Sequence, residues 1–232
     1  MPHLRREDAV FVLDLGEPDR IDTENRFTPE WMDALHACLD EVQAADGPKA
    51  LVTTGSGKFY SNGFEPERFA GPDAAGYLLA GQRVFERLLT FPAPTVAAVQ
   101  GHAFGAGAIL AVAHDGRVMR GDRGYFCLPE ITLPLAQSDD GLVIPGGIAD
   151  LLTARLPGPA AHEAMLTGRR YGGHDALAAG IVEAVEKHER VLPVALTRAG
   201  ALAGTAGPAL GAMKRWMYRD VVAALGKVTL TC

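Results

Sequence analysis

The sequence predicts an α/β fold followed by a helical C-terminal region. Short apolar runs typical of strands alternate with helical periodicity up to about residue 185, and helical periodicity alone continues beyond it. A length of 232 residues suits one sizeable domain, and a content of 48% hydrophobic residues is ordinary for a globular protein. We therefore expect a core over residues 1–185 and a helical region over residues 186–232.

The first half of the chain contains three predicted strands and two predicted helices. β-branched and apolar runs predict strands at 9–15, 50–53 and 95–99, separated by loops at 16–26 and 55–63. Thr28 and Pro29 are typical of an N-cap and a first helical residue, so a helix is expected from there to about residue 45. A second helix opens at residues 72–73, with an apolar set of Tyr77, Leu78, Val84, Leu88 and Leu89.

The second half predicts shorter elements. Strands are expected at 118–119, 125–128 and 181–185, with a long loop over 129–147. Helices are expected at 148–155, 159–166 and 174–179. From about residue 191 to 225 the pattern predicts two helices broken at 204–208.

Composition excludes several classes of protein. A net charge of -6 and the lack of any Lys/Arg cluster argue against nucleic-acid binding. Cys38, Cys127 and Cys232 lack metal-ligand spacing, so we expect no metal site and a reduced, intracellular protein. Neither a signal peptide nor a membrane-length apolar run is present, which predicts a cytoplasmic protein without a membrane partner.

A glycine-rich turn at 101–107 joins the strand 95–99 to an apolar run at 106–113. The first N–H groups of a helix lack intrahelical partners, so such a turn can bind an anion through the backbone. Tight packing of strand against helix explains the glycines equally well. Residues 55–58 lack the spacing of a P-loop, and Leu110 replaces the third glycine of a dinucleotide fingerprint.

Glu130 is a candidate general base. It follows Pro129 directly after a short apolar strand, and Ile131 and Leu133 come next. Burial among such residues raises the pKa of a carboxyl group and makes it a better proton acceptor near neutral pH. A solvated loop acid is the alternative interpretation.

Four segments in order resemble the crotonase (enoyl-CoA hydratase/isomerase) superfamily. They are residues 49–64 (KALVTTGSGKFYSNGF), 93–107 (APTVAAVQGHAFGAG), 125–131 (YFCLPEI) and 166–182 (LTGRRYGGHDALAAGIV). The resemblance implies a spiral of ββα units with a helical C-terminal region for trimerisation. It also implies an acyl-CoA substrate and a homotrimer or hexamer, with no metal and no separate cofactor, because coenzyme A enters with the substrate.

By motif position, the resemblance places the backbone N–H groups of Phe64 and Ala106 in an oxyanion hole. These donors would hold the thioester oxygen while an enolate forms, and such a donor contributes roughly 3–4 kcal/mol in comparable sites. Gly63 and Gly105 leave room for the thioester. Asn62 lies beside them in the same motif and is a candidate contact to the substrate.

The family's hydratases carry two glutamates, and this sequence keeps one. Ile109 stands at the position of the first, so Glu130 remains as the single acid/base. An enzyme that moves a double bond needs only one base. In this respect the sequence resembles the Δ3,Δ2-enoyl-CoA isomerases of fatty acid metabolism, and residues 114–124 also resemble that branch. Asp139 or Asp140 can supply a second carboxylate, which keeps a hydratase, lyase or hydrolase open. A catalytically silent acyl-CoA-binding protein is the further alternative.

Contacts to coenzyme A are less regular. Glu67 replaces a lysine with which hydratases often contact the nucleotide of coenzyme A, so Arg68 is the nearest cation for that role. A solvated surface arginine is the alternative interpretation. Lys214 and Arg215 stand where relatives place a basic residue near the CoA phosphates. Four apolar residues are candidates for the acyl pocket or for the core: Phe27, Tyr60, Phe64 and Leu133.

Overall fold

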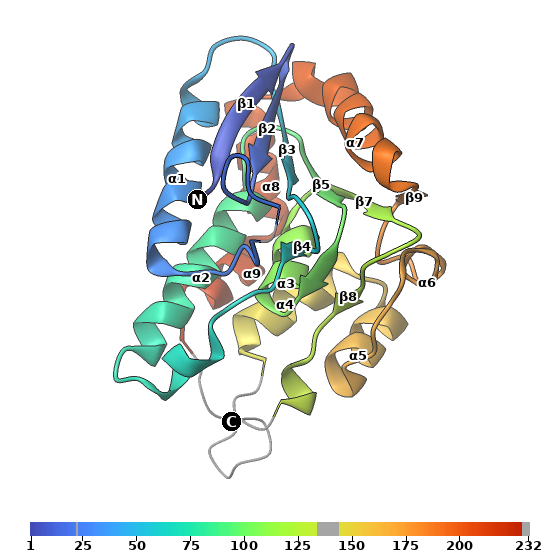
Figure 1. Ribbon diagram of the computed structural model, residues 1–232. Coiled ribbons are helices and arrows are strands. Elements are labelled where there is room, and N and C mark those ends of the chain that lie inside the picture. The colour runs from blue at the N-terminus through green and yellow to red at the C-terminus, as the bar shows by residue number, and fades with distance from the viewer. Residues whose placement is uncertain (22, 134–143, 229–232) are drawn as a thin grey trace.

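In the computed structural model, which describes residues 1–21, 23–133 and 144–228, the strands form two sheets (Figure 1). The larger sheet has the order β1 (His3–Glu7), β2 (Val10–Asp14), β3 (Ala50–Thr54), β5 (Thr95–Val99), β7 (Gly116–Arg120) and β9 (Ala184–Glu186). β1 is antiparallel to β2, and the other neighbours are parallel. The smaller, parallel sheet has the order β4 (Phe59–Ser61), β6 (His102–Phe104) and β8 (Phe126–Cys127).

The chain winds through both sheets in repeated strand–strand–helix units. β3 and β4 lead to α2 (Ala74–Leu89), β5 and β6 lead to α3 (Ala106–Ala113), and β7 and β8 lead to α4 (Gly146–Arg155). Each unit adds one parallel strand to each sheet, so the chain forms the spiral that the family resemblance implies. The remaining helices are α1 (Pro29–Ala44), α5 (Gly158–Thr167), α6 (Gly173–Ala178), α7 (His188–Leu202), α8 (Pro208–Met217) and α9 (Arg219–Leu225).

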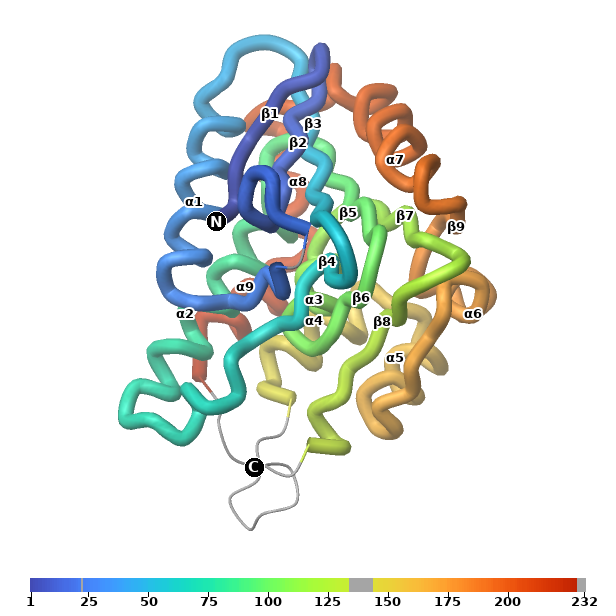
Figure 2. The backbone as a smooth tube through the Cα atoms, in the orientation of Figure 1, coloured from blue at the N-terminus to red at the C-terminus, as the bar shows by residue number. Residues whose placement is uncertain are grey.

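Helices cover both faces of the larger sheet, with α1 and α7 on opposite sides in Figure 2. Successive strand side chains point to opposite faces. Phe11 and Leu51 accordingly join the main core with α1, α2 and α3, whereas Val52 and Val96 pack against the small apolar residues of α7. At the start of α1 the Thr28 hydroxyl accepts a hydrogen bond from the Trp31 N–H at 3.1 Å, which confirms the predicted N-cap.

Three strands were not predicted. β1 carries charged residues because it is an edge strand with an exposed face, so the apolar signal is weak. β4 and β6 have three residues each and lie inside glycine-rich segments that the sequence indicated as loops. Short 3₁₀ turns also occur at Pro66–Ala70, Glu130–Thr132 and Ala203–Thr205.

The described part of the helical region is broken near 204–208 as predicted, but it contains three helices because the chain turns again at Tyr218 between α8 and α9. Two buried polar side chains fasten it to the core. The Lys214 ammonium on α8 lies 2.6 Å from Asp115 Oδ2. The Gln82 Nε2 on α2 donates to the carbonyls of Leu225 at 2.6 Å and Lys227 at 2.9 Å.

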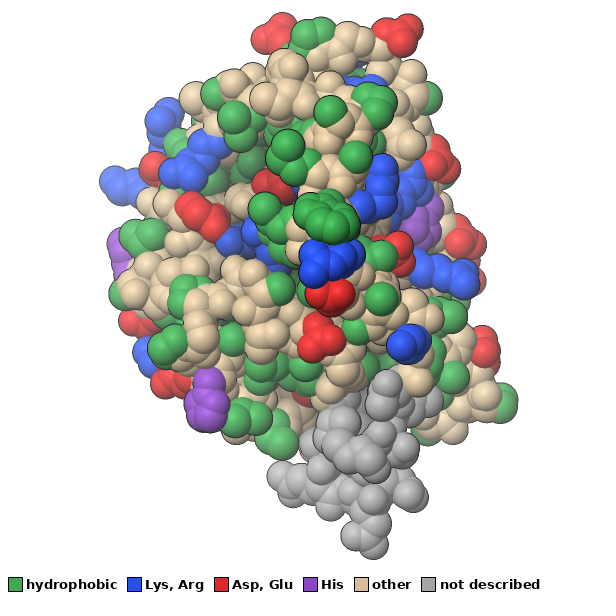
Figure 3. All heavy atoms as spheres, turned by 180° about the vertical axis from the view of Figure 1, so that it is seen from behind, with side chains coloured by type: hydrophobic (Ala, Val, Ile, Leu, Met, Phe, Trp, Pro, Cys, Tyr) green, Lys and Arg blue, Asp and Glu red, His purple; other side chains and the backbone are tan. Residues whose placement is uncertain are grey.

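The outer face of α8 is exposed and apolar. Met213, Trp216 and Met217 keep 65%, 71% and 65% of their surface accessible. α8 lies behind the larger sheet in Figure 1, on the side that Figure 3 presents, where hydrophobic side chains alternate with charged ones. None of the helices in the described residues combines the length and the apolarity that crossing a bilayer requires.

Candidate active site

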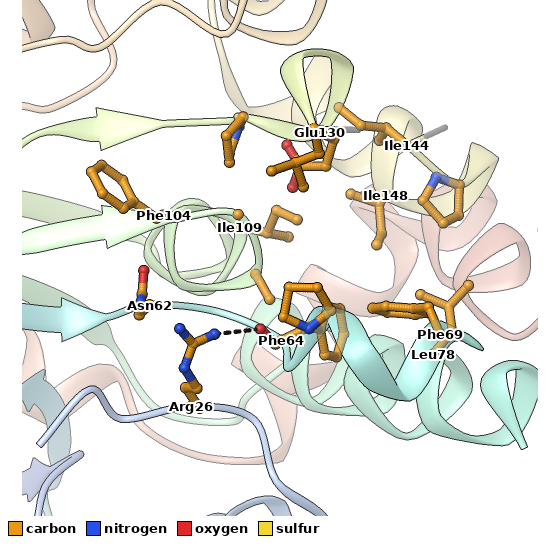
Figure 4. Close-up of a pocket in the computed structure, with 16 residues that line it drawn as sticks. Arg26, Asn62, Phe64, Phe69, Leu78, Phe104, Ile109, Glu130, Ile144 and Ile148 are labelled. Atoms are coloured by element: carbon orange, nitrogen blue, oxygen red, sulfur yellow. Dashed lines mark hydrogen bonds between the residues drawn. The ribbon is translucent and has the colours of Figure 1, made fainter. Parts of the chain in front are cut away.

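A cavity of about 300 Å³ lies where the spiral units meet (Figure 4). The turn after β4, the turn between β6 and α3, the 3₁₀ turn after β8, and helices α2 and α4 surround it. Most of its lining is apolar, which makes it suitable for an acyl chain. The lining residues include Phe64, Phe69, Leu78, Phe104, Ile109, Leu133, Ile144 and Ile148.

Two glycines bring two backbone turns into contact at this cavity. Gly63 and Gly105 have φ angles of +75° and +52°, which residues with a side chain rarely adopt. A Cβ on Gly63 would lie 2.6 Å from the Phe104 carbonyl oxygen and 2.9 Å from the Ala106 nitrogen. Gly63 therefore lets the turn that carries Phe64 pack directly against the turn that carries Ala106.

The two amides that follow these glycines are available for a ligand. Ala106 begins α3, and its N–H, like that of Phe64, donates no hydrogen bond within the described part of the chain. Helix-initial N–H groups lack intrahelical acceptors and carry the positive end of the helix dipole. Both residues line the cavity, and unbonded backbone N–H groups are donors of the kind that stabilise an oxyanion.

Residues 24–27 hold the Phe64 turn in place. The Phe27 N–H donates to the Gly63 carbonyl at 3.0 Å, and this carbonyl belongs to the same peptide as the Phe64 N–H. An acceptor bond of this kind polarises the peptide and strengthens its N–H as a donor. The Arg26 Nη1 donates to the next carbonyl, that of Phe64, at 3.0 Å, as the dashed line in Figure 4 marks.

The Glu130 carboxylate lies beside the second turn. The Gly105 N–H donates to the Cys127 carbonyl at 3.0 Å, which ties the turn to β8, three residues before Glu130. A Cβ on Gly105 would lie 3.2 Å from Glu130 Oε1. Figure 4 shows the carboxylate on the side of the cavity opposite Phe64.

Burial raises the pKa of Glu130 to about 7, and its own backbone N–H opposes the shift. The residue as a whole is partly exposed, but its Oε2 atom is buried and has no hydrogen-bond partner. An unpaired buried carboxyl oxygen is costly, so it indicates a group kept for chemistry rather than for stability. A carboxyl group with this pKa can take and return a proton near neutral pH.

The described lining of the cavity contains no second carboxylate beside Glu130. Ile109 lies one turn along α3 from Ala106, is 2% exposed and lines the cavity. Arg26 and Glu130 are the lining residues with ionisable side chains in the described part of the chain. Asp139 and Asp140 lie outside the described residues.

Of the residues predicted to contact the substrate or coenzyme A through their side chains, Asn62 lines the cavity, whereas Arg68 and Lys214 do not. Asn62 lines the cavity, and its Nδ2 donates to Glu24 Oε2 at 3.0 Å. Arg68 does not line it; its guanidinium pairs with Glu65 and lies 5.6 Å from the Tyr77 ring centre. Lys214 does not line the cavity either, and its ammonium is buried between Asp115 and the Ala93 carbonyl; its contact with coenzyme A stays a prediction. Burial lowers the pKa of Lys214.

Of the four candidate pocket residues, Phe64 and Leu133 line the cavity. Phe27 and Tyr60 are fully buried core residues, and the Tyr60 hydroxyl lies 2.7 Å from Thr53 Oγ1. Sequence reasoning missed Arg26, Phe69, Ile144 and Ile148 as lining residues. Phe69, Ile144 and Ile148 are apolar and give the same sequence signal in a core as in a cavity wall, so periodicity does not reveal them; Arg26 lies in a segment that was predicted as a loop.

Taken together, the cavity combines two backbone donors with one raised-pKa carboxylate. Such a set can remove a proton next to a carbonyl group while the donors stabilise the resulting oxyanion. Among the described residues no group of three or more His, Cys, Asp or Glu side chains is arranged to hold a metal ion.

Comparison with known proteins assigns a family to this arrangement. Residues 5–229 match the family described as enoyl-CoA hydratase/isomerase. The chain is 32% identical to the peroxisomal enoyl-CoA delta isomerase 2 of Arabidopsis thaliana, over 97% of this chain and 95% of that protein. It is 31% identical to a putative enoyl-CoA hydratase of Thermus thermophilus, over 87% of this chain and 77% of that protein.

Solved structures agree with the fold. An apo enoyl-CoA isomerase structure from Mycobacterium tuberculosis superposes with a TM-score of 0.84 at 28% identity, covering 97% of this chain and 93% of that chain. The human mitochondrial delta3-delta2-enoyl-CoA isomerase superposes with a TM-score of 0.81 over 97% of this chain and 85% of that chain; at 22% identity it supports the fold alone.

Proposed function

The chain belongs to the enoyl-CoA hydratase/isomerase family, and from this membership we propose that it moves the double bond of a 3-enoyl-CoA to the 2-position. The observation that carries the proposal is the single carboxylate of the described cavity. Glu130 lies beside the Gly105–Ala106 turn and across the cavity from Phe64, while Ile109 fills the position where a second carboxylate would serve hydration.

The proposed reaction is two proton transfers through one enolate. The thioester oxygen accepts hydrogen bonds from Phe64 and Ala106. Glu130 takes a proton from C2, and the electrons of that C–H bond move to form an extended enolate. The same carboxyl group then returns the proton to C4, the double bond forms between C2 and C3, and the thioester carbonyl is restored. Coenzyme A enters as part of the substrate, and we propose no separate cofactor.

A paired assay tests the reaction type. Purified protein with 3-hexenoyl-CoA should produce the conjugated 2-enoyl thioester, followed by its ultraviolet absorbance. With 2-hexenoyl-CoA it should show no comparable loss of that absorbance through hydration. Hydration at a similar rate would replace the proposal with a hydratase. Binding of acyl-CoA without either turnover would identify a catalytically silent binding protein.

The pH dependence of the reaction should report Glu130. The base acts as a carboxylate, so protonation below its pKa removes activity. With a pKa near 7, kcat/KM should rise about tenfold per pH unit below pH 7 and level off above it. Initial rates between about pH 5.5 and 8.5 measure this. A flat profile over this range, as expected for a glutamate with its ordinary pKa of about 4.3, would show that the carboxylate is solvated during the reaction.

Replacing Gly63 with alanine should lower kcat by about 10²–10³-fold, the usual effect of losing one oxyanion donor. The added Cβ would press on the Phe104 carbonyl and the Ala106 amide and separate the two turns. Gly47→Ala is the matched control, since Gly47 has φ +76° and nothing lies within 4 Å of its added Cβ. It should lose about 1–2 kcal/mol of stability and keep its rate. Equal rates in the two variants would contradict the assignment.

We further propose assembly as a homotrimer or hexamer in the cytoplasm. The exposed apolar face of α8, formed by Met213, Trp216 and Met217, supports self-association, because large apolar side chains gathered on a surface are typical of interfaces.

A further inference from the structure

The Phe64 side chain lies between the cavity and α2, while its backbone N–H belongs to the amide pair. Other aromatic rings surround it. The ring centres of Tyr77, Phe27 and Phe69 lie 5.1, 5.3 and 5.4 Å from that of Phe64. In Figure 4, Phe64 shares one wall of the cavity with Phe69 and Leu78, and Glu130, Ile144 and Ile148 lie on the other. The position of this ring therefore bears on the width of the cavity.

Gly81 on α2 provides the space that the ring occupies. A Cβ at Gly81 would lie 2.2 Å from Phe64 Cζ and 2.4 Å from Phe64 Cε1. Gly81 is buried in the interior of α2, and its backbone is not in the left-handed region. Glycine costs a helix interior about 1 kcal/mol relative to alanine, so its presence here needs a packing reason. The Phe64 ring is that reason.

A methyl group at Gly81 would move the ring in one direction. An ordinary contact needs about 3.4 Å, so the ring must shift by about 1 Å away from α2. Phe27 and Phe85 are fully buried, and Tyr77 and Phe69 hold the ring edges. The cavity is the open volume that the ring borders, so the displaced ring enters it.

We propose that the Phe64–Gly81 pair sets the width of the acyl cavity and thereby determines which 3-enoyl-CoA chain lengths the protein accepts. Phe64 would then have two roles: its backbone N–H binds the thioester oxygen, and its ring forms the cavity wall beside the acyl chain. This inference rests on the proposed isomerase function and adds the part of the substrate that the cavity selects.

The test compares a six-carbon and a twelve-carbon substrate. The readout is the ratio of kcat/KM for 3-dodecenoyl-CoA to that for 3-hexenoyl-CoA. In Gly81→Ala this ratio should fall at least about tenfold below the wild-type ratio, since one methyl group in an apolar pocket discriminates by about 10–200-fold. Gly76→Ala is the matched control on the same helix. Its Cβ would meet the Asp73 side chain, away from the cavity, and its ratio should equal that of the wild type.

A second variant removes the ring and keeps the amide. Phe64→Leu should raise the same ratio, because the shorter side chain widens the cavity. Adding Gly81→Ala to Phe64→Leu should change the ratio by less than about twofold, since no ring remains for the methyl group to displace. This cycle also covers the case in which Gly81→Ala alone fails to fold, because Phe64→Leu must still raise the ratio.

Two outcomes overturn the inference. One is a wild-type ratio in Gly81→Ala, and the other is an equal fall of the ratio with and without the Phe64 ring. Failure of the proposed function is distinct, because wild-type protein would then turn over neither substrate. Dissociation constants for saturated hexanoyl-CoA and dodecanoyl-CoA would still report the cavity width without turnover. The preference for the longer chain should again be lowest in Gly81→Ala, intermediate in the wild type and highest in Phe64→Leu.

Discussion

Replacing Glu130 with glutamine is expected to lower the isomerisation rate by about 10²–10⁴-fold, the usual contribution of general acid–base catalysis. The amide has nearly the shape of the carboxyl group but cannot accept the C2 proton. Glu67→Gln is the matched control, because Glu67 is exposed on the 3₁₀ turn beside the cavity and does not line it. It should keep the wild-type rate. Full activity in Glu130→Gln would end the assignment of Glu130 as the base.

The same variant should be more stable than the wild type at high pH. The folded pKa of Glu130, about 7, lies above its unfolded value, so the folded state binds the proton more tightly. The stability associated with that proton is fully present below about pH 4 and is lost as pH rises to 7. Above pH 7 the buried carboxylate should cost about 1–3 kcal/mol relative to the neutral amide.

Thermal unfolding at pH 5 and pH 8 measures this difference. The melting temperature of Glu130→Gln should exceed that of the wild type mainly at pH 8, by roughly 2–4 °C for each kcal/mol in a chain of this size. An advantage of equal size at both pH values would show that the charge of Glu130 is not the cause. Gained stability together with lost turnover would mark the group as one held in an unfavourable state for its chemistry.

Replacing Lys214 with methionine should cost about 2–4 kcal/mol of unfolding free energy. Removing one partner of a buried ion pair leaves the other charge uncompensated, an effect that reaches about 3–5 kcal/mol when both are buried. Here Lys214 is buried but the Asp115 side chain is 37% exposed, which moderates the loss. Asp115 Oδ2 would keep the Thr95 N–H at 2.8 Å as a donor. Urea unfolding reports the change.

Two further variants separate the ion pair from other effects. Arg215→Met, at the exposed neighbour on α8, should change stability by less than about 0.5 kcal/mol. Combining Lys214→Met with Asp115→Asn should recover part of the loss, because no uncompensated charge remains. KM for acyl-CoA should stay near the wild-type value in the folded Lys214→Met protein. A large rise in KM without a loss of stability would return Lys214 to the coenzyme A site.

The buried strands at the centre of the larger sheet were predictable because they carry a strong local signal, whereas its edge strand β1 was not. Every residue in 50–53 and 95–99 is either apolar or β-branched, as is typical of buried parallel strands. β4 and β6 lack such a signal. Each is three residues long and pairs with strands that lie about 20–40 residues away in the sequence, so local pattern does not reveal it.

In the candidate site too, features with a local sequence signal could be predicted, and contacts between distant residues could not. The glycines at 101–107 left a ligand and tight packing equally open, and the resemblance to a family supplied Phe64, Ala106 and Glu130 as a set. The sequence shows a lysine at position 214 on a predicted helix, but it does not show that the Asp115 carboxylate, 99 residues away, pairs with this lysine. The Phe64–Gly81 contact was invisible for the same reason, since a glycine inside a predicted helix carries no sign of its partner.

The hydrogen bonds from Gln82 to the carbonyls of Leu225 and Lys227 have a consequence for the order of events during synthesis. Gln82 follows Gly81 directly on α2, the helix that also carries Leu78 into the cavity wall. Its acceptors are made 143 and 145 residues later. On a translating ribosome, α2 therefore emerges early and lacks its buried acceptors until residues 225–227 follow. This contact between α2 and residues 225–227 can therefore form only late in synthesis.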